Sequence, residues 1–118
     1  MIEIRNKVTR SSKALKLKIY PVNQEVYETG DVVIQCRDEG DLRAKVYWEK
    51  GVSRHSQHIR DVLRKLPQNA VDYNGRLEIS RIMYNQAGTF ICKAAGHEKQ
   101  WGGEATATVE VLRSPYRI

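Results

Sequence analysis

The sequence predicts an all-β protein, an antiparallel β-sandwich of two sheets joined by one disulfide bond. Three observations support this fold class. Cys36 and Cys92 are the two cysteines of the chain, and Trp48 lies twelve residues after the first. In extracellular β-sandwiches, two cysteines on facing sheets form a bridge and an indole at this position packs against it. Short alternating apolar and polar runs, separated by turn residues, fill most of the remaining chain.

The first predicted strands alternate clearly between an inward and an outward face. Alternation runs over 15–20 until Pro21 interrupts it, as expected of an edge strand that changes sheets. A turn at 28–31 precedes a half-buried strand over 32–36 that ends on Cys36. After a polar loop at 37–41, Val46 and Trp48 share the inner face of the next strand.

The second half of the chain continues this pattern. Asn74-Gly75 predicts a tight turn, and Leu77 and Ile79 alternate behind it. A strand carrying Phe90 and Cys92 on its inner face follows, and a closing strand covers 105–111. The segment 52–69 does not fit, because its apolar residues have helical spacing until Pro67; one or two helical turns or an irregular connection both remain open.

Composition limits the function classes. The chain has 118 residues, 41% of them hydrophobic and 29% charged, which describes one soluble globular domain. No apolar run approaches the roughly 20 residues of a spanning helix, and the N-terminus lacks the apolar core of a secretory signal. We therefore expect a secreted form to be a fragment of a longer chain without its own signal peptide.

Four segments carry a resemblance to a known family: 30–36 (GDVVIQC), 46–50 (VYWEK), 75–79 (GRLEI) and 87–92 (AGTFIC). Through them, residues 15–112 resemble an immunoglobulin domain of the I-set. The resemblance implies an immunoglobulin-like sandwich with a Cys36–Cys92 bridge and a core that includes Trp48, Leu77 and Phe90. It implies no enzyme activity and no cofactor. Residues 1–14 are then a basic linker or arm, and 113–118 a C-terminal tail.

A narrower resemblance is to the immunoglobulin repeats of perlecan, a basement-membrane heparan sulfate proteoglycan. It rests on 19–22 (IYPV), 33–40 (VIQCRDEG) and 43–48 (RAKVYW). It implies a secreted, non-catalytic extracellular matrix domain that acts as a spacer and as a binding surface for matrix proteins or heparan sulfate. Neighbouring immunoglobulin modules of the same chain would also be partners.

Two alternatives stay open at this point. One is a cell-adhesion or receptor ectodomain that binds a protein partner through an exposed sheet. The other is an intracellular muscle-type spacer, in which Cys36 and Cys92 would be two buried thiols.

The sequence departs from the family pattern at two positions. Gln86 and Phe90 replace the Asp and Tyr that the family usually has, so the tyrosine-corner hydrogen bond cannot form. Another group must hold the connection that leads into the strand of Cys92, or this connection is less stable by about 1 kcal/mol, the contribution of one hydrogen bond.

Positive charge suggests a polyanion as one possible partner. The net charge is +6, and the first 18 residues hold six Lys and Arg against one Glu. Together with the basic residues of 54–65 they could bind sulfated glycosaminoglycan through multiple cationic contacts, or they could simply be solvated. Nucleic acid is not expected, because no aromatic residues are interleaved with the charges. The candidate polyanion-binding residues are Arg5, Lys7, Arg10, Lys13, Arg54, Arg60, Arg64 and Lys65.

Other candidate sites are few. Tyr47 should face outward beside the buried Trp48, and Trp101 lies in the loop before the last strand, so both are candidate protein contacts. His55 and His58 have a spacing that could hold zinc on a helix, but flanking arginines and the lack of a third ligand argue against a metal site. The sequence shows no nucleophile, base and orienting group in a catalytic pattern.

Overall fold

The computed structural model describes residues 15–51 and 65–113. Their elements, in chain order, are β1 (Leu17–Tyr20), β2 (Asn23–Tyr27), β3 (Val32–Asp38), β4 (Val46–Lys50), β5 (Ala70–Tyr73), β6 (Arg76–Ile79), the short 3₁₀ helix η2 (Tyr84–Gln86), β7 (Gly88–Ala94) and β8 (Glu104–Leu112). The predicted arm 1–14, residues 52–64 of the ambiguous segment 52–69, and residues 114–118 lie outside the described residues.

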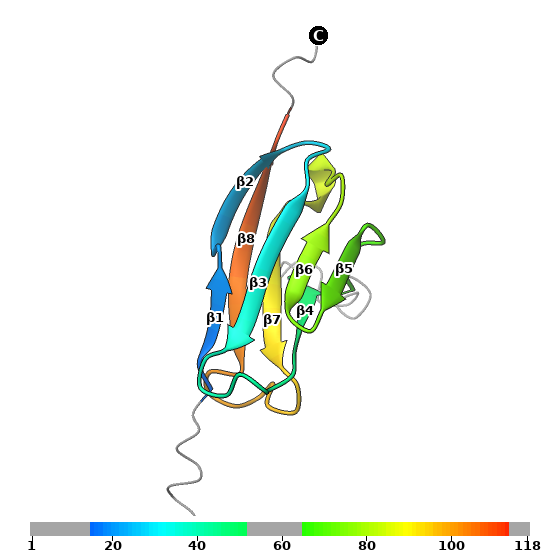
Figure 1. Cartoon of the computed structure of the whole chain (residues 1–118). Coiled ribbons are helices and arrows are strands. Elements are labelled where there is room, and N and C mark those ends of the chain that lie inside the picture. The colour runs from blue at the N-terminus through cyan, green and yellow to red at the C-terminus, as the bar shows by residue number, and fades with distance from the viewer. Residues whose placement is uncertain (1–14, 52–64, 114–118) are drawn as a thin grey trace, which may run out of the picture.

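The strands form two four-stranded sheets packed face to face (Figure 1). Sheet A has the order β1-β3-β6-β5, and sheet B has the order β2-β8-β7-β4. The disulfide Cys36–Cys92 joins β3 of sheet A to β7 of sheet B. The predicted all-β sandwich with one inter-sheet disulfide is therefore confirmed. β1 begins near one pole of the sandwich and β8 ends at the other (Figure 1).

The chain changes sheets at Pro21, as its sequence predicts. β1 pairs with β3 in sheet A, and only Pro21 and Val22 separate it from β2, which pairs with β8 in sheet B. β2 continues in the direction of β1 (Figure 1) and pairs parallel with β8. The expectation of a wholly antiparallel sandwich is wrong at this one pair.

The core lies between the sheets and is built from the inward residue of each alternating pair. Trp48 is 3% exposed, and Leu77 and Phe90 are fully buried. Trp48 stands opposite Cys92 in the β4–β7 register, so the indole lies beside the disulfide. The other buried members of this cluster are Ile19, Val32, Ile34, Cys36, Val46, Ile79, Ile82, Ala107, Val109 and Val111.

Strand β5 has an alternation opposite to the one that hydrophobicity suggests. Its apolar residues Val71 and Tyr73 are exposed, whereas Ala70 packs against the core and the charged Asp72 is half-buried. A pattern search places apolar residues inside, so it does not find this strand. Hydrogen bonds made by Asp72 explain why the polar face turns inward here.

The crossing before β7 is held without a tyrosine hydroxyl. The side-chain oxygen of Gln86 accepts hydrogen bonds from the Met83 N–H at 2.9 Å and from the Asn69 amide at 3.0 Å. The Gln86 amide donates back to the Asn69 oxygen at 2.9 Å. In addition, the Lys50 ammonium lies 5.2 Å from the centroid of the Phe90 ring. Gln86 thus supplies the substitute for the tyrosine corner.

Candidate protein-binding faces

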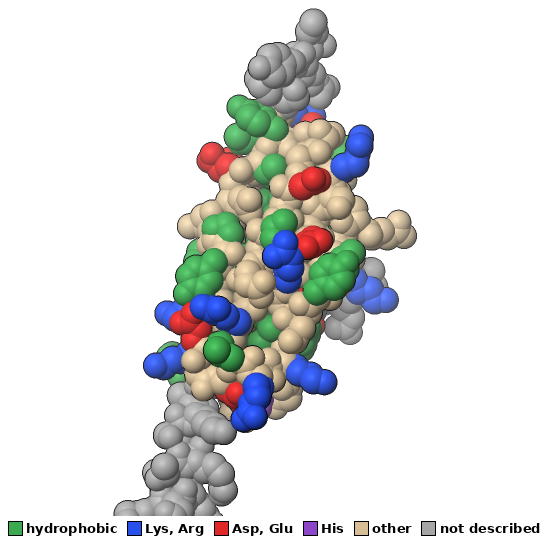
Figure 2. All heavy atoms as spheres, viewed as in Figure 1, with side chains coloured by type: hydrophobic (Ala, Val, Ile, Leu, Met, Phe, Trp, Pro, Cys, Tyr) green, Lys and Arg blue, Asp and Glu red, His purple; other side chains and the backbone are tan. Residues whose placement is uncertain are grey.

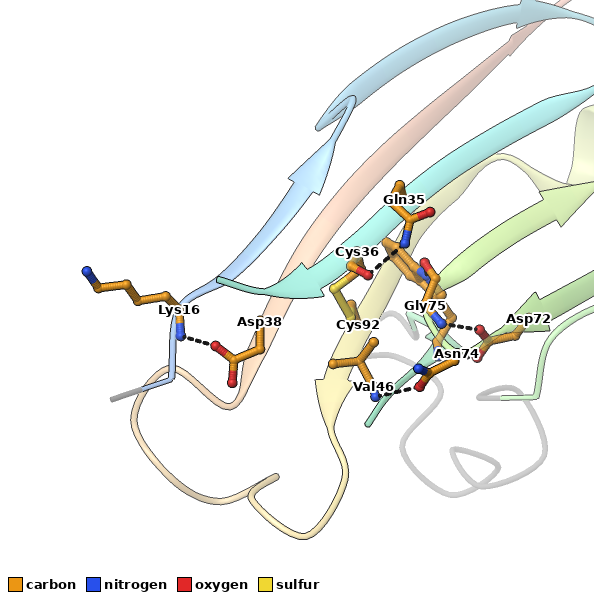
Figure 3. Close-up of a disulfide and its surroundings, with 10 residues drawn as sticks. Lys16, Gln35, Cys36, Asp38, Val46, Asp72, Asn74, Gly75 and Cys92 are labelled. Atoms are coloured by element: carbon orange, nitrogen blue, oxygen red, sulfur yellow. Dashed lines mark hydrogen bonds between the residues drawn. A yellow bond between two sulfur atoms is a disulfide. The ribbon is translucent and has the colours of Figure 1, made fainter. Parts of the chain in front are cut away.

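One edge of sheet B, the strand β4, is covered by side chains from sheet A. There the Val46 N–H donates to the side-chain oxygen of Asn74 at 3.1 Å (Figure 3), and the Trp48 N–H donates to the Asp72 carboxylate at 2.8 Å. The Asp72 carboxylate also accepts the Gly75 N–H at 2.8 Å. Because these donors are occupied, β4 is a poor template for an added strand. Strand addition at this edge of sheet B is therefore disfavoured, and the two outer faces remain as candidate binding surfaces.

The β5–β6 turn joins the two sheets at the same corner. The Gly75 carbonyl accepts the Trp48 indole N–H at 2.7 Å and the Cys36 N–H at 2.8 Å. Gly75 has φ +102°, and an added Cβ would lie 2.4 Å from the Cys36 carbonyl oxygen. Only glycine suits this position, because both the dihedral angle and the space exclude a side chain.

A buried carboxylate lies toward the β1 edge of sheet A, at the end of β3. Asp38 is 3% exposed, and its Oδ1 accepts the Lys16 N–H at 3.0 Å and the Gly40 N–H at 2.8 Å. Figure 3 shows the Lys16 bond. The Cys-Arg-Asp-Glu-Gly stretch, one basis of the perlecan resemblance, therefore has a structural role in fixing the start of β1 to the β3–β4 turn.

Face A, the outer surface of sheet A, exposes four large apolar side chains. Tyr20, Val33, Val71 and Tyr73 are each 40–60% exposed. The strand register places Tyr20, Gln35, Arg76 and Tyr73 in one row across all four strands. Hydrophobic, basic and acidic side chains are interspersed over this face (Figure 2). Tyrosine and arginine are the residue types enriched at binding hot spots.

Charged residues of face A form pairs that stay accessible. Arg76 and Glu78 are 2.6 Å apart, and Arg37 and Glu39 are 3.0 Å apart. The Arg37 side chain also lies over the Tyr20 ring, whose hydroxyl donates to Glu39 at 3.3 Å. The hydrogen bond from Arg37 holds the pKa of Glu39 below its ordinary value. Both guanidinium groups are about half exposed, so they keep N–H donors for a partner.

Face B, the outer surface of sheet B, is polar and acidic. On this face Lys93 pairs with Glu49 at 3.0 Å. The remaining carboxylates of face B make no ion pair with any residue that the structure describes; they are Glu25, Glu104 and Glu110. Glu25 stands directly beside Glu110 in the β2–β8 register. An open hollow of 560 Å³ lies there, lined by Asn23, Gln24, Glu25, Thr108 and Glu110.

The structure separates the two predicted protein contacts. Tyr47 is half-buried on face B, and its hydroxyl donates to Glu98 at 2.7 Å, which lowers the pKa of that carboxyl. Trp101, in the β7–β8 loop, is 98% exposed and therefore contributes almost no packing. The larger set of exposed apolar residues is on face A. The sequence alternation predicts that Tyr20 and Val33 face outward. Only the position of β5 in the structure shows that Val71 and Tyr73 lie on the same face.

Of the candidate polyanion-binding residues, only Lys65 lies within the described residues, where it is exposed. Arg5, Lys7, Arg10, Lys13, Arg54, Arg60 and Arg64 lie outside them. Residues 15–51 and 65–113 contain twelve Lys and Arg and twelve Asp and Glu, so this part of the chain is electrically neutral. The whole excess of positive charge belongs to the other segments.

Within residues 15–51 and 65–113, no three His, Cys, Asp or Glu side chains are placed to hold a metal ion. The paired His55 and His58 lie outside these ranges. The same ranges contain no helix long and apolar enough to span a membrane.

The pattern of two sheets, disulfide and buried tryptophan agrees with a family match over residues 16–95, described as immunoglobulin domain. The chain belongs to the immunoglobulin domain family. This family is typically non-catalytic and binds protein partners.

Two curated relatives and two solved structures are similar to the chain. The chain is 26% identical to contactin-4 of Homo sapiens and of Rattus norvegicus over 89 residues, which is 75% of this chain and 8% of the relative's length. The chain thus spans a small part of the length of these relatives. The N-terminal four immunoglobulin domains of Dscam1 isoforms 1.9 and 8.4 share the fold, with TM-scores of 0.56 and 0.57. Their identities are 19% and 21%, and each alignment covers 84% of this chain and 21% of the Dscam1 chain.

Proposed function

We propose that this chain is an extracellular immunoglobulin module of the cell-adhesion or receptor type, which binds a protein partner through the outer face of a sheet. The observation that carries the proposal is the similarity to contactin-4, a cell-adhesion ectodomain, over 75% of the chain. This favours the adhesion alternative over the perlecan-like matrix function that the narrower resemblance implies.

Face A supports the proposal as the docking surface. A buried binding hot spot needs large apolar side chains that are available in the free protein and polar groups that give orientation. Face A offers both. The strand neighbours of the Arg76–Glu78 pair include Val33, Val71 and Tyr73, and Tyr20 lies at the far end of the same row. Trp101 is a second anchor in this proposal, because its side chain is almost fully solvated before binding.

The charge distribution argues against heparan sulfate as the partner of the folded body. Polyanion binding needs a cluster of uncompensated cations, and the described part of the chain is neutral. A heparan sulfate site would therefore have to be formed by basic residues outside these ranges. A matrix spacer that binds through its arm is the competing function, and the experiment below separates the two.

Binding of the multimerised chain to cells tests the proposal. We expect binding to survive treatment of the cells with heparin lyase and to be lost after mild protease treatment of the cells. Tyr73→Ala should reduce binding at least tenfold, the effect of one hot-spot side chain worth about 1.4 kcal/mol or more. Leu42→Ala is the matched control, because Leu42 is equally apolar and 69% exposed but lies in the β3–β4 loop.

Two outcomes contradict the proposal. Binding that disappears with heparin lyase and with the removal of residues 1–14 would make the chain a polyanion-binding spacer. Equal losses for Tyr73→Ala and Leu42→Ala would show that face A has no special role. Trp101→Ala, measured in parallel, tests whether the β7–β8 loop contributes to the same contact.

A further inference from the structure

The two outer faces of the sandwich have opposite electrostatic character. Face A carries three cations, Lys18, Arg37 and Arg76, against Glu78 and, at the end of β3, Glu39. Face B carries four carboxylates against the single cation Lys93. Face A thus has a net charge of +1 and face B of −3, and the loops and edges of the described residues carry the remaining +2 that makes this part of the chain neutral. A neutral body with oppositely charged faces favours association in one orientation.

The carboxylates of face B that lack an ion pair are complementary to the cations of face A that keep free N–H donors. On face B, Glu25, Glu104 and Glu110 have no ion-pair partner among the residues described. On face A, Lys18 makes no salt bridge to another described residue, and Arg37 and Arg76 each use only the donors that reach one nearby carboxylate. A guanidinium has five N–H donors, so both arginines can bind a second carboxylate.

Position also favours this match. Arg76 stands in the interior of the face A row, between Gln35 and Tyr73. Glu25 and Glu110 stand side by side at the hollow of face B, with Asn23 and Thr108 as further lining residues. A long cationic side chain that projects from the middle of this row fits a hollow lined by two carboxylates. The exposed Tyr20 and Tyr73 supply apolar area on either side of it.

Two copies of the same face do not neutralise each other's charges. Face A against face A would bring Lys18, Arg37 and Arg76 of two copies together, and face B against face B would bring unpaired carboxylates together. Like charges placed opposite one another at an interface disfavour that pairing. Face A against face B leaves neither repulsion.

We propose that face A of one copy docks on face B of a second copy. The contact is heterologous, so each copy keeps one face free and association continues beyond the dimer. This inference rests on the proposed function, because it takes face A as the docking surface and names its partner as the same chain on a neighbouring molecule.

Sedimentation equilibrium of the full-length chain tests this contact. For the wild type we expect the weight-average mass to rise as the protein concentration is increased from about 10 μM to about 1 mM, the range in which weak association is detected. The rise should disappear in about 0.5 M NaCl, where the Debye length falls to roughly 4 Å. A wild type that stays monomeric throughout this range at low salt overturns the proposal.

Charge reversal makes the test specific. Arg76→Glu changes only face A and Glu110→Arg only face B, so each variant alone should stay monomeric. An equimolar mixture should form heterodimers, because the native face B of the first variant meets the native face A of the second. Association of Glu110→Arg alone at the wild-type level overturns the proposal, since a symmetric face A dimer behaves in that way. A mixture that stays monomeric overturns it as well.

Folding and function are controlled separately. Both side chains are exposed, and near-ultraviolet circular dichroism verifies the fold of each variant. Lys18→Glu and Glu25→Arg repeat the design at second positions if either first variant is unfolded. If self-association fails while cell binding remains sensitive to Tyr73→Ala, the proposed function stands with a different protein as the partner. If self-association occurs and cells are not bound, the proposed function fails alone.

Discussion

Replacing Asp72 with alanine should lower the free energy of unfolding by about 3 kcal/mol. The Asp72 carboxylate accepts two backbone hydrogen bonds of 2.8 Å, one from Trp48 in sheet B and one from Gly75 in the β5–β6 turn. A hydrogen bond to a charged group contributes about 1.5–3 kcal/mol, and a buried N–H without an acceptor is costly. We take the low end for each bond because the carboxylate is only half-buried.

Urea denaturation with the disulfide intact, followed by tryptophan fluorescence, measures this change. Asp72→Asn keeps one acceptor oxygen and should lose about half as much. Asp41→Ala is the control, because Asp41 accepts one local bond at 3.1 Å from the exposed Arg43 N–H, and its loss should stay below about 1 kcal/mol. Equal losses for Asp72→Ala and Asp41→Ala would refute the inference that Asp72 joins the two sheets.

Four further predictions follow from the same contacts. Trp48→Ala should lose about 3–5 kcal/mol in urea, because it empties the core beside the disulfide; near-wild-type stability would contradict the assigned core. Gly75→Ala should lose more than about 1 kcal/mol, since its Cβ would overlap the Cys36 carbonyl oxygen; an unchanged melting temperature would show that the turn can shift. Tyr47→Phe should raise the pKa of Glu98 towards its ordinary value, measured by carboxyl-carbon NMR, because the tyrosine hydroxyl bond is the main cause of the lowered pKa. Since that pKa is lowered in the folded state, the associated stability is present above pH 4.5 and is lost as the pH falls through the folded pKa; a pKa unaffected by the mutation would exclude this link. Trp101→Ala should change stability by less than about 0.5 kcal/mol, and a larger loss would mean that the indole packs on the domain.

Fold class was predictable from the sequence because each supporting pattern is local or involves a few fixed spacings. Alternation in β3 and β8 gave the inner faces, and the Cys36, Trp48 and Cys92 triplet gave the link between sheets. Pro21 marked the change of sheet, because proline removes a donor from any ladder. Strand β5 was missed, since its inward Asp72 is justified only by donors that are distant in sequence.

The candidate binding surface was harder to predict than the fold. Tyr47 and Trp101 were chosen because each is an aromatic residue at an outward or loop position. Face A was overlooked, because Tyr20 in β1 and Tyr73 in β5 are 53 residues apart and meet in one row only through β3 and β6. Net charge was easier to assign, because the sequence already places six Lys and Arg against one Glu in its first 18 residues, and the described part of the chain is neutral.

The sequence by itself determined the family, the sandwich and the disulfide, because burial alternation and covalent pairing are properties of local composition and spacing. Only the tertiary structure decided that β2 pairs parallel with β8, that Gln86 replaces the tyrosine corner and that face A and face B differ in charge. These features depend on which strands become neighbours. Register across a sheet brings together residues that no sequence window contains, and their hydrogen bonds and charges act at distances of a few ångströms.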